Sequence, residues 1–430
     1  MEQLLHYVWK HKIFPFRELR TVDGRAVEVL NPGISNTNAG PDFTGASVKI
    51  DGMVWVGNVE VHMKTSDWFR HHHDQDSAYD TIVLHVAAEV DVPLYYPDGR
   101  EVPQLQLEVP QYVRDNYEQL RLADRMPRCK HVVSGLPAFQ IHNWMTSLML
   151  ERFEERTRQI LARRELLDKD WENTLFVTLA RSFGFGINGD AFETWAKSVP
   201  MSAVAKHRDS LFQVEALFFG QAGLLEGEGT DDYYLKLQKE YRYLMRKFTL
   251  KPIASGAWKF LRLRPQNFPH IRIAQLAMMC YEQRMSQSRL INARTVEEMD
   301  ALLLTHVSEY WQTRYTFGGR ETKVQERALS VPTKERVIVN ALAPVLFAYG
   351  KYKSDQSLCE RAFTLWEQLP PECNKVTREW ASAGVVCESA ADSQALIQLS
   401  SRYCQPRDCL RCRFGYEYIK QTPDLLRENE

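Results

Sequence analysis

Two short segments carry residues whose types and spacing suit metal-dependent hydrolysis. Pro41 and Asp42 precede the run FTGASVKI, and 17 residues separate Asp42 from Glu60 in the run MVWVGNVEVHM. Because side chains alternate along a strand, Glu60, His62 and Lys64 are expected on one face, with apolar residues on the other. Three ionisable groups on one strand face are costly to bury unless a metal ion or a substrate compensates them.

The chemistry that these residue types favour is hydrolysis of a phosphodiester bond. Carboxylates hold a hard divalent cation that keeps open positions for water and for a phosphate oxygen. The cation lowers the pKa of its bound water, and a neighbouring Lys or His orients that water or moves its proton. A simpler interpretation stays open, in which Pro41 and Asp42 form a turn and the strand face is solvated.

The segment SDWFRHHHDQDSAYD, residues 66–80, is unusually rich in candidate ligands. Ser66 can cap a helix and Asp67 suits its first turn, so we expect one helix that packs beside the strand face. His71, His73 or Asp76 would then contact the substrate or a second metal ion. One alternative is a solvated polar helix, and another is a metallohydrolase of small substrates that uses these histidines.

Three cysteines late in the sequence form a second candidate metal site. Cys404, Cys409 and Cys412 have the spacing C-x4-C-x2-C, and thiolates two residues apart can reach one metal ion from a tight loop. A fourth ligand is needed, and Cys129 in the polar run MPRCKH is preferred to Cys373. Ordinary reduced cysteines are the alternative.

The stretch WKFLRLRPQNFPHIRIAQLA, residues 258–277, places Arg262, Arg264 and Arg272 among aromatic residues and prolines. Basic and aromatic side chains together can hold a phosphate backbone and stack on bases, so these arginines are candidate contacts to nucleic acid. Alternatively, they pair with acidic neighbours at a helix junction. The glycines of GFGING, residues 184–189, follow a helical pattern instead of a strand, which predicts a turn and not a dinucleotide site.

Two kinds of secondary structure must position these residues. An amphipathic helix over residues 1–13 is followed by strand-like runs, with Asp51-Gly52 as a hairpin turn, in the order helix, strand, hairpin, helix, strand. The later part of the chain has helical spacing of apolar residues, interrupted by Gly and Pro. The pattern predicts an α+β or α/β domain over residues 1–125, with a mixed sheet flanked by helices. A large all-α domain over residues 138–430, ending in the cysteine-rich segment, is expected to follow.

The order of these elements resembles the PD-(D/E)XK nuclease superfamily. In that superfamily, Asp after Pro and an acidic residue on the next strand bind Mg²⁺, and a Lys two positions on assists the attacking water. Pro41, Asp42 and Glu60 match this pattern, whereas His62 stands at the Lys position and Lys64 lies one strand period further. The resemblance implies a nuclease with Mg²⁺ or Mn²⁺ on Asp42 and Glu60, His62 or Lys64 serving the water, and DNA as the polymer. Because the motif Lys is absent, an inactive nucleic-acid-binding or scaffold protein is the alternative.

Some nucleases of this superfamily hold an iron–sulfur cluster through cysteines from both sides of the chain. Cys129 with Cys404, Cys409 and Cys412 resembles that arrangement, and either a [4Fe–4S] cluster or Zn²⁺ would use these ligands. The whole chain, especially NAGPDF, NVEVH, SDW, AYD, LRLRPQNFP and the cysteine motif, is also similar to a bacterial family described as a domain of unknown function. That second resemblance implies a single architecture and no particular chemistry.

The composition is that of a soluble globular protein. Of 430 residues, 44% are hydrophobic and 25% are charged, and the net charge is −1. Residues 1–120 carry 10 Lys and Arg against 18 Asp and Glu. An excess of acidic residues of this kind is expected around a metal site lined by carboxylates. Charges interrupt the N-terminal apolar positions, and polar residues, Pro or Gly interrupt the longer apolar runs. We therefore expect no signal peptide, no membrane span, and a cytoplasmic protein with reduced cysteines.

Overall fold

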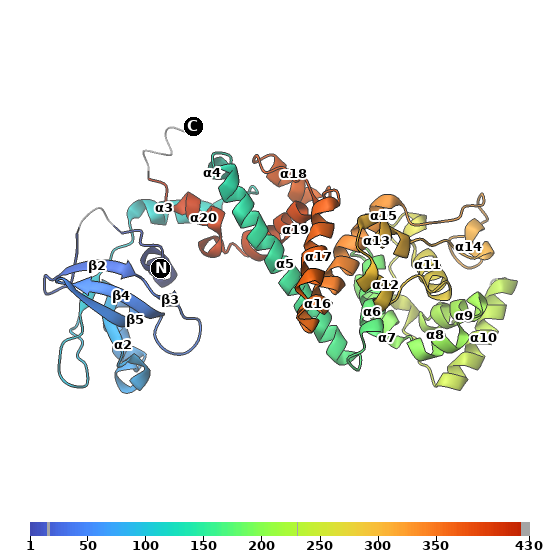
Figure 1. Ribbon diagram of the computed structural model, residues 1–430, viewed down its shortest axis with the longest axis horizontal. Helices are drawn as coiled ribbons and strands as arrows, with labels where there is room; N and C mark the ends of the chain where they lie inside the picture. The colour runs from blue at the N-terminus through green and yellow to red at the C-terminus, as the bar shows by residue number, and fades with distance from the viewer. Residues whose placement is uncertain (15–17, 230, 423–430) are drawn as a thin grey trace. The chain divides into compact units, whose positions relative to one another are not determined.

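The computed structural model describes residues 1–14, 18–229 and 231–422 (Figure 1). Contacts divide the chain into two compact units. The first unit contains Met1–Ile141, Ser382–Val385 and the segment that begins at Ser400, and the second contains His142–Ala381 and Val386–Leu399. The segment from Ser400 thus groups with the sheet-containing unit. The two domains expected from the sequence, residues 1–125 and 138–430, instead assign this segment to the helical domain.

A mixed sheet of seven strands forms the first unit. The strands are β1 (Leu19–Arg20), β2 (Ala26–Asn31), β3 (Ile34–Ser35), β4 (Phe43–Ile50), β5 (Met53–Lys64), β6 (Ile82–Glu89) and β7 (Gln104–Gln106). Their order in the sheet is β1-β2-β4-β5-β6-β7, with β3 paired to β4. The pairs up to β4–β5 are antiparallel, whereas β5–β6 and β6–β7 are parallel. The mixed sheet predicted from the sequence is therefore confirmed.

The hairpin between β4 and β5 turns at the predicted position. Asp51 and Gly52 have positive φ angles of 46° and 84°, which an Asp-Gly pair adopts at low cost. Helix α1 (Glu2–Lys10) packs against β5 and buries an apolar face that includes Leu5. Helix α1, strand β2, the β4–β5 hairpin, helix α2 (Asp67–Arg70) and strand β6 follow one another in the expected order.

The two ends of this sheet meet. Thr21, directly after β1, forms an antiparallel bridge with Leu105 of β7, and the Val22 N–H donates a 2.9 Å hydrogen bond to the carbonyl of Gln104. Register irregularities in the β2–β4 and β4–β5 pairs add local bends to the ordinary twist of the strands. The sheet is therefore nearly barrel-shaped, a closure that the sequence pattern did not predict.

The histidine-rich segment does not form the single helix that we expected. Helix α2 ends at Arg70, and two 3₁₀ turns follow at His73–Gln75 and Ser77–Tyr79. His72 has a left-handed conformation with φ of 60°, which a continuous right-handed helix cannot contain. The helix is interrupted here, and the histidines on either side of residue 72 each place one ring nitrogen within 4.8 Å of a nitrogen of His62 on β5.

The second unit is helical, as the sequence predicts. Its helices are α5 (Ala138–Leu166, whose first residues belong to the first unit), α6 (Trp171–Phe183), α7 (Gly189–Ser198), α8 (Met201–His207), α9 (Leu211–Gln221), α10 (Asp232–Phe248), α11 (Pro269–Tyr281), α12 (Gln287–Asn292), α13 (Val296–Leu302), α14 (Glu309–Thr313), α15 (Val331–Val337), α16 (Ala343–Lys353), α17 (Gln356–Gln368), α18 (Lys375–Ala381) and α19 (Ala390–Leu399). Of the glycines of GFGING, Gly184 and Gly186 lie in the turn between α6 and α7, where Gly186 has φ of 86°, and Gly189 begins α7.

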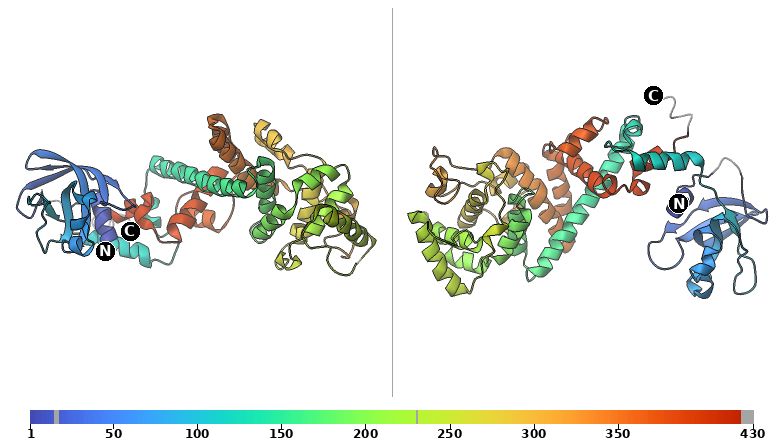
Figure 2. Two further views of the ribbon diagram at one scale, coloured as in Figure 1. Left: turned by 90° about the horizontal axis from the view of Figure 1, so that it is seen from below. Right: turned by 180° about the vertical axis from the view of Figure 1, so that it is seen from behind.

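Three further helices complete the first unit: α3 (Gln111–Leu122), α4 (Lys130–Val133) and α20 (Arg413–Ile419). Helix α20 lies beside α3, as the views in Figure 2 also show. The side-chain amide of Asn116 on α3 donates hydrogen bonds to the carbonyls of Ile419 and Gln421 at 3.2 and 2.9 Å. These bonds satisfy carbonyl groups at the end of α20 and hold this late segment against α3.

Candidate metal centre

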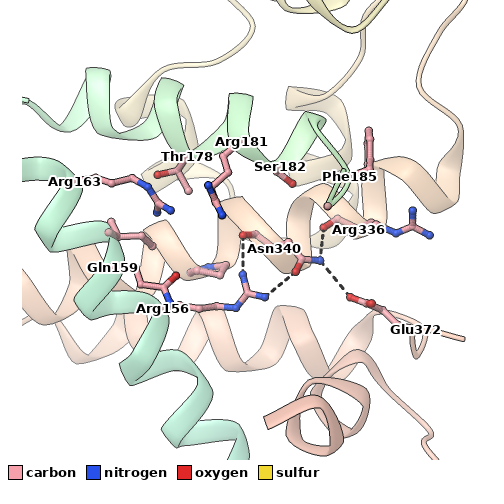
Figure 3. A pocket seen from close by; sticks show the side chains of 13 residues that line it. Arg156, Gln159, Arg163, Thr178, Arg181, Ser182, Phe185, Arg336, Asn340 and Glu372 are labelled. Atoms are coloured by element: carbon pink, nitrogen blue, oxygen red, sulfur yellow. Dashed lines mark hydrogen bonds between the residues drawn. The ribbon is translucent and has the colours of Figure 1, made fainter. Parts of the chain in front are cut away.

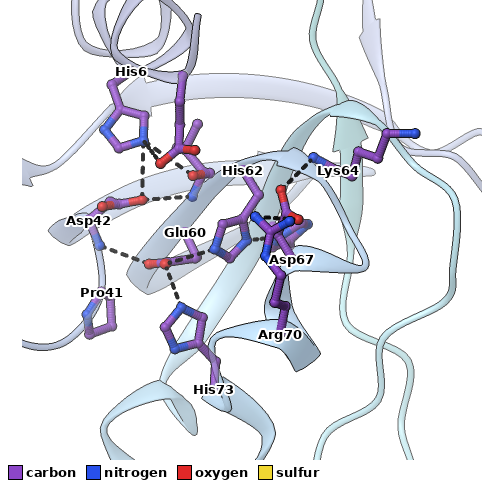
Figure 4. A network of polar contacts seen from close by, with 12 residues as sticks. His6, Pro41, Asp42, Glu60, His62, Lys64, Asp67, Arg70 and His73 are labelled. Atoms are coloured by element: carbon purple, nitrogen blue, oxygen red, sulfur yellow. Dashed lines mark hydrogen bonds and ion pairs between the residues drawn. The ribbon is translucent and has the colours of Figure 1, made fainter.

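Asp42 and Glu60 lie next to each other on adjacent strands. Asp42 directly precedes β4, and Glu60 lies within β5. The main-chain N–H of Asp42 donates a hydrogen bond to Glu60 Oε2 at 2.9 Å, and Asp42 Oδ2 accepts one from the Val61 N–H at 3.1 Å. The structure therefore brings together the two carboxylates that the sequence singles out (Figure 4).

The charged forms of both carboxylates are unfavourable where they lie. Burial, followed by the neighbouring charge of Asp42, raises the pKa of Glu60 to about 8. Burial also raises the pKa of Asp42, although the nearby His6 opposes that effect. A bound cation would compensate both charges and remove the penalty, so these donors suit a divalent metal ion.

Three imidazoles converge beside Glu60. Among the described residues, one nitrogen each of His62, His71 and His73 lies within 4.8 Å of the other two. Glu60 Oε1 lies 3.5 Å from His62 Nε2 and 3.3 Å from His73 Nε2. Figure 4 shows the rings of His62 and His73 approaching the same oxygen of this carboxylate. We call Asp42, Glu60, His62, His71 and His73 the Asp–Glu–His cluster.

The imidazoles of His62 and His73 are held in their neutral form. Burial, with smaller effects of His73 and His71, lowers the pKa of His62 to about 3. Burial and the neighbouring His71 also lower the pKa of His73. At neutral pH these rings therefore offer lone pairs, which is the state in which histidine binds a metal ion or accepts a proton.

A second layer of residues orients the imidazoles. His62 Nδ1 shares a 3.0 Å hydrogen bond with Nε2 of the buried His85 on β6, which leaves His62 Nε2 toward Glu60. The ring of His73 stacks on Tyr79 with a centroid separation of 3.9 Å. Partners of this kind commonly fix the ring orientation of metal-binding histidines.

Two residues of this site were not predicted from the sequence. His6 on α1 places Nε2 3.4 Å from Asp42 Oδ2 and 3.2 Å from the carbonyl of Val61. His85 is paired with Glu60 in the β5–β6 register. An imidazole within the apolar run TIVLHVAA is a signal that would have singled out His85, whereas nothing local distinguishes His6.

Lys64 does not join the cluster. It lies four residues beyond Glu60, roughly 13 Å along the strand, and its exposed Nζ forms a 2.8 Å ion pair with Glu89 on β6. That hydrogen bond and charge raise the pKa of Lys64. Of the two residues expected to serve the attacking water, His62 contacts Glu60 and Lys64 does not.

The three arginines predicted to contact nucleic acid lie in the second unit and differ in exposure. Arg262 and Arg264 are exposed. Arg272 is buried within α11, and its guanidinium donates hydrogen bonds to Gln275 Oε1 at 2.9 Å and to Asn267 Oδ1 at 2.6 Å. Because its side chain is buried, Arg272 is not presented to a ligand at the surface.

The four cysteines of the second candidate site belong to the first unit. Cys129 precedes α4, Cys404 ends a π-helical turn, and Cys409 and Cys412 flank the turn before α20. Burial raises the pKa of the Cys129 thiol, and the other three cysteines add to that effect. Burial likewise raises the pKa of Cys404, with further contributions from Cys412 and Cys409. Thiol sulfurs are the donor type that Zn²⁺ and iron–sulfur clusters use.

Comparison with known proteins places the chain in a family. Residues 2–375 match the family described as "Protein of unknown function (DUF2851)". The chain belongs to this family. The predicted resemblance to a family of this description is thereby confirmed. No curated protein and no solved structure matches the chain. Among the residues that the structure describes, no helix has the length and apolar character needed to cross a membrane.

Proposed function

We propose that this protein is a metal-dependent nuclease whose first unit hydrolyses phosphodiester bonds in DNA. The observation that carries the proposal is the pairing of Asp42 with Glu60 across adjacent strands, through a 2.9 Å hydrogen bond. The chain order also supports it, because Pro-Asp, hairpin and Glu occur in the order that the PD-(D/E)XK resemblance implies. Strand β6 returns parallel to β5 after the short helix α2, which agrees with the same resemblance.

The donor set points to Mn²⁺ more than to Mg²⁺. Mg²⁺ prefers oxygen ligands, whereas the cluster offers imidazole nitrogens beside its carboxylates. Asp42 and Glu60 would hold the cation, with His62, His71 or His73 completing the protein ligands. When bound, the cation supplies a water molecule of lowered pKa and compensates charge on the phosphate.

His62 takes the position that Lys occupies in the motif. Its ring is neutral at pH 7, because burial lowers its pKa to about 3, and its Nε2 lies beside Glu60. His85 holds the opposite nitrogen of the same ring. A neutral imidazole in this position can orient the attacking water or accept its proton, and Lys64, turned toward Glu89, cannot.

A second candidate function rests on the three imidazoles. His62, His71 and His73 with Glu60 resemble the mixed histidine and carboxylate ligand sets of zinc hydrolases, in which one coordination position holds water. The protein would then hydrolyse small substrates and would prefer Zn²⁺. Metal preference and substrate size distinguish the two functions.

The deciding experiment compares cleavage of labelled single-stranded and double-stranded DNA and RNA in the presence of Mn²⁺, Mg²⁺ or Zn²⁺. We expect Mn²⁺-dependent cleavage of DNA by the wild type and its loss in Asp42→Asn and Glu60→Gln. A small phosphodiester, bis(p-nitrophenyl) phosphate, tests the second function in parallel. Hydrolysis of only the small ester, with Zn²⁺, would select the second function. Binding of DNA without cleavage under every condition would indicate an inactive binding or scaffold protein.

We also propose that Cys129, Cys404, Cys409 and Cys412 bind a structural metal centre, either Zn²⁺ or a [4Fe–4S] cluster. Cys129 is far in sequence from the segment that contains Cys404, Cys409 and Cys412, and helix α4 after Cys129 contacts helix α20 after Cys412. A metal ion would compensate thiolates at these buried positions and would join α4 to α20. Metal analysis and the absorption spectrum of the purified protein distinguish the two centres.

A further inference from the structure

The second unit contains a cavity lined by arginines. Its volume is about 270 Å³, and the lining includes Arg156, Arg163, Arg181 and Arg336, with Glu372 as the carboxylate in the lining. Figure 3 shows the guanidinium groups of Arg156, Arg163 and Arg181 approaching the same space from helices α5 and α6. The lining shares no residue with the Asp–Glu–His cluster, so this cavity is a separate feature of the protein.

The arginines are fixed in place by the surrounding fold. The guanidinium of Arg156 donates to the carbonyl and the side-chain oxygen of Asn340 at 3.0 and 2.7 Å. Glu193 on α7 forms ion pairs with Arg163 at 3.1 Å and with Arg181 at 2.8 Å. Arg181 also pairs with Asp190 at 2.6 Å. The four arginines still exceed the three carboxylates in and behind the cavity, which are Glu372, Glu193 and Asp190. The excess positive charge is therefore preorganised and favours an anion.

Two buried polar atoms of the lining have no partner among the described residues. These are Thr178 Oγ1 and Arg156 Nε. Buried polar atoms in folded proteins nearly always have a hydrogen-bond partner, and an atom without one commonly marks the place of a ligand or of ordered water. Since one of the two belongs to an arginine and the other to a hydroxyl, an oxyanion can satisfy both.

We propose that this cavity binds the phosphate group of a small anionic molecule. Planar guanidinium groups match the oxygen geometry of phosphate and can donate paired hydrogen bonds to it. A cavity of about 270 Å³ has the volume of roughly nine water molecules in the liquid, which exceeds one phosphate and leaves space for the group that carries it. The inference concerns the second unit and is independent of the proposed nuclease activity.

Binding is tested by titration calorimetry on the full chain in EDTA, so that no cation bridges a phosphate to the Asp–Glu–His cluster. The probes are inorganic phosphate, pyrophosphate, a 5′-mononucleotide and a 5′-phosphorylated oligodeoxynucleotide. We expect the wild type and Asp42→Asn to bind the small probes equally. Binding of the oligonucleotide alone would overturn the assignment to a small molecule, and binding of none of the probes at millimolar concentration would overturn the anion site itself.

Two substitutions test whether phosphate binds in this cavity. Arg181→Gln removes a cation and Thr178→Val removes the unpartnered hydroxyl while keeping the side-chain shape. Each is expected to weaken phosphate binding about tenfold or more. Arg246→Gln, an exposed arginine on α10, is the matched control and should bind as the wild type does. If Arg181→Gln fails to fold, Thr178→Val still tests the proposal. The loss of an unpartnered buried hydroxyl should not lower the melting temperature of the ligand-free protein, so we expect this variant to fold. Wild-type affinity in a folded Thr178→Val variant would overturn the proposal.

Discussion

The main-chain N–H of Asp42 donates a hydrogen bond of 2.9 Å to Glu60 Oε2, which links the start of β4 to the middle of β5. This bond places two carboxylates together in a buried region, although their charges repel. It also makes a precise variant available, because Gln at position 60 keeps an oxygen acceptor for the Asp42 N–H and removes the charge. The effects of charge and of position can therefore be separated at this site.

The first prediction concerns the dependence of stability on pH without metal. The folded-state pKa of Glu60, about 8, is above its ordinary value of 4.5, so the folded protein binds an extra proton between these values. The free energy of unfolding should therefore fall as pH rises through this window, by at most about 1.4 kcal/mol per pH unit. His62 and His85, with pKa values lowered to about 3, act in the opposite direction, but only below pH 6.5.

The clearest range for this measurement is pH 6.5 to 8. Denaturant unfolding in EDTA should show declining stability for the wild type and a smaller decline for Glu60→Gln. Burial also raises the pKa of Glu215 in the second unit to about 7. Glu215 is present in both proteins, so its contribution cancels when the stability of Glu60→Gln is subtracted from that of the wild type. Saturating Mn²⁺ should remove the part of the wild-type decline that Glu60 contributes, because the cation binds the deprotonated carboxylate. Identical profiles for the two proteins in EDTA would show that Glu60 titrates normally.

The second prediction separates three consecutive histidines. His71 and His73 belong to the Asp–Glu–His cluster, whereas His72 has a left-handed backbone and lies outside it. His71→Asn and His73→Asn should each weaken Mn²⁺ binding about tenfold or more, measured by calorimetry or by electron paramagnetic resonance of the free ion. His72→Asn is the matched control, because Asn tolerates the left-handed conformation. Equal losses in all three variants would contradict the cluster.

The candidate site shows how far sequence reasoning extends. Asp42, Glu60 and His62 could be related to one another because alternation within a strand and the hairpin turn are local properties. His6 and His85 reach the site through packing of α1 and pairing of β6, which are long-range contacts that the local pattern does not contain. The closure of the sheet was not predicted for the same reason, since it depends on a bridge between residues far apart in the chain. The predicted continuous helix was wrong because His72 has a left-handed conformation, which a right-handed helix cannot contain.

The third prediction distinguishes His62 from Lys64. Lys64→Gln should retain Mn²⁺-dependent cleavage within about twofold, because its Nζ pairs with Glu89 at an exposed position and such pairs contribute little. His62→Gln should lower kcat by about 100-fold or more, since it removes the candidate proton acceptor. Rates under single-turnover conditions measure the effect directly. A large loss in Lys64→Gln, with His62→Gln unaffected, would restore the usual role of the motif Lys.

The fourth prediction concerns the cysteine site. If Cys129, Cys404, Cys409 and Cys412 hold one metal centre, protein purified without oxygen should contain zinc, or iron and sulfide, in stoichiometric amount. Single substitutions to Ser at Cys404 or Cys409 should release the metal and lower the melting temperature of the first unit, because the centre joins segments distant in sequence. Cys373→Ser is the matched control, since this exposed cysteine lies in the second unit and should leave metal content unchanged. Full metal content in both the Cys404→Ser and Cys409→Ser variants would exclude this centre. Helix α20 would then be held against α3 by the hydrogen bonds of Asn116 to Ile419 and Gln421.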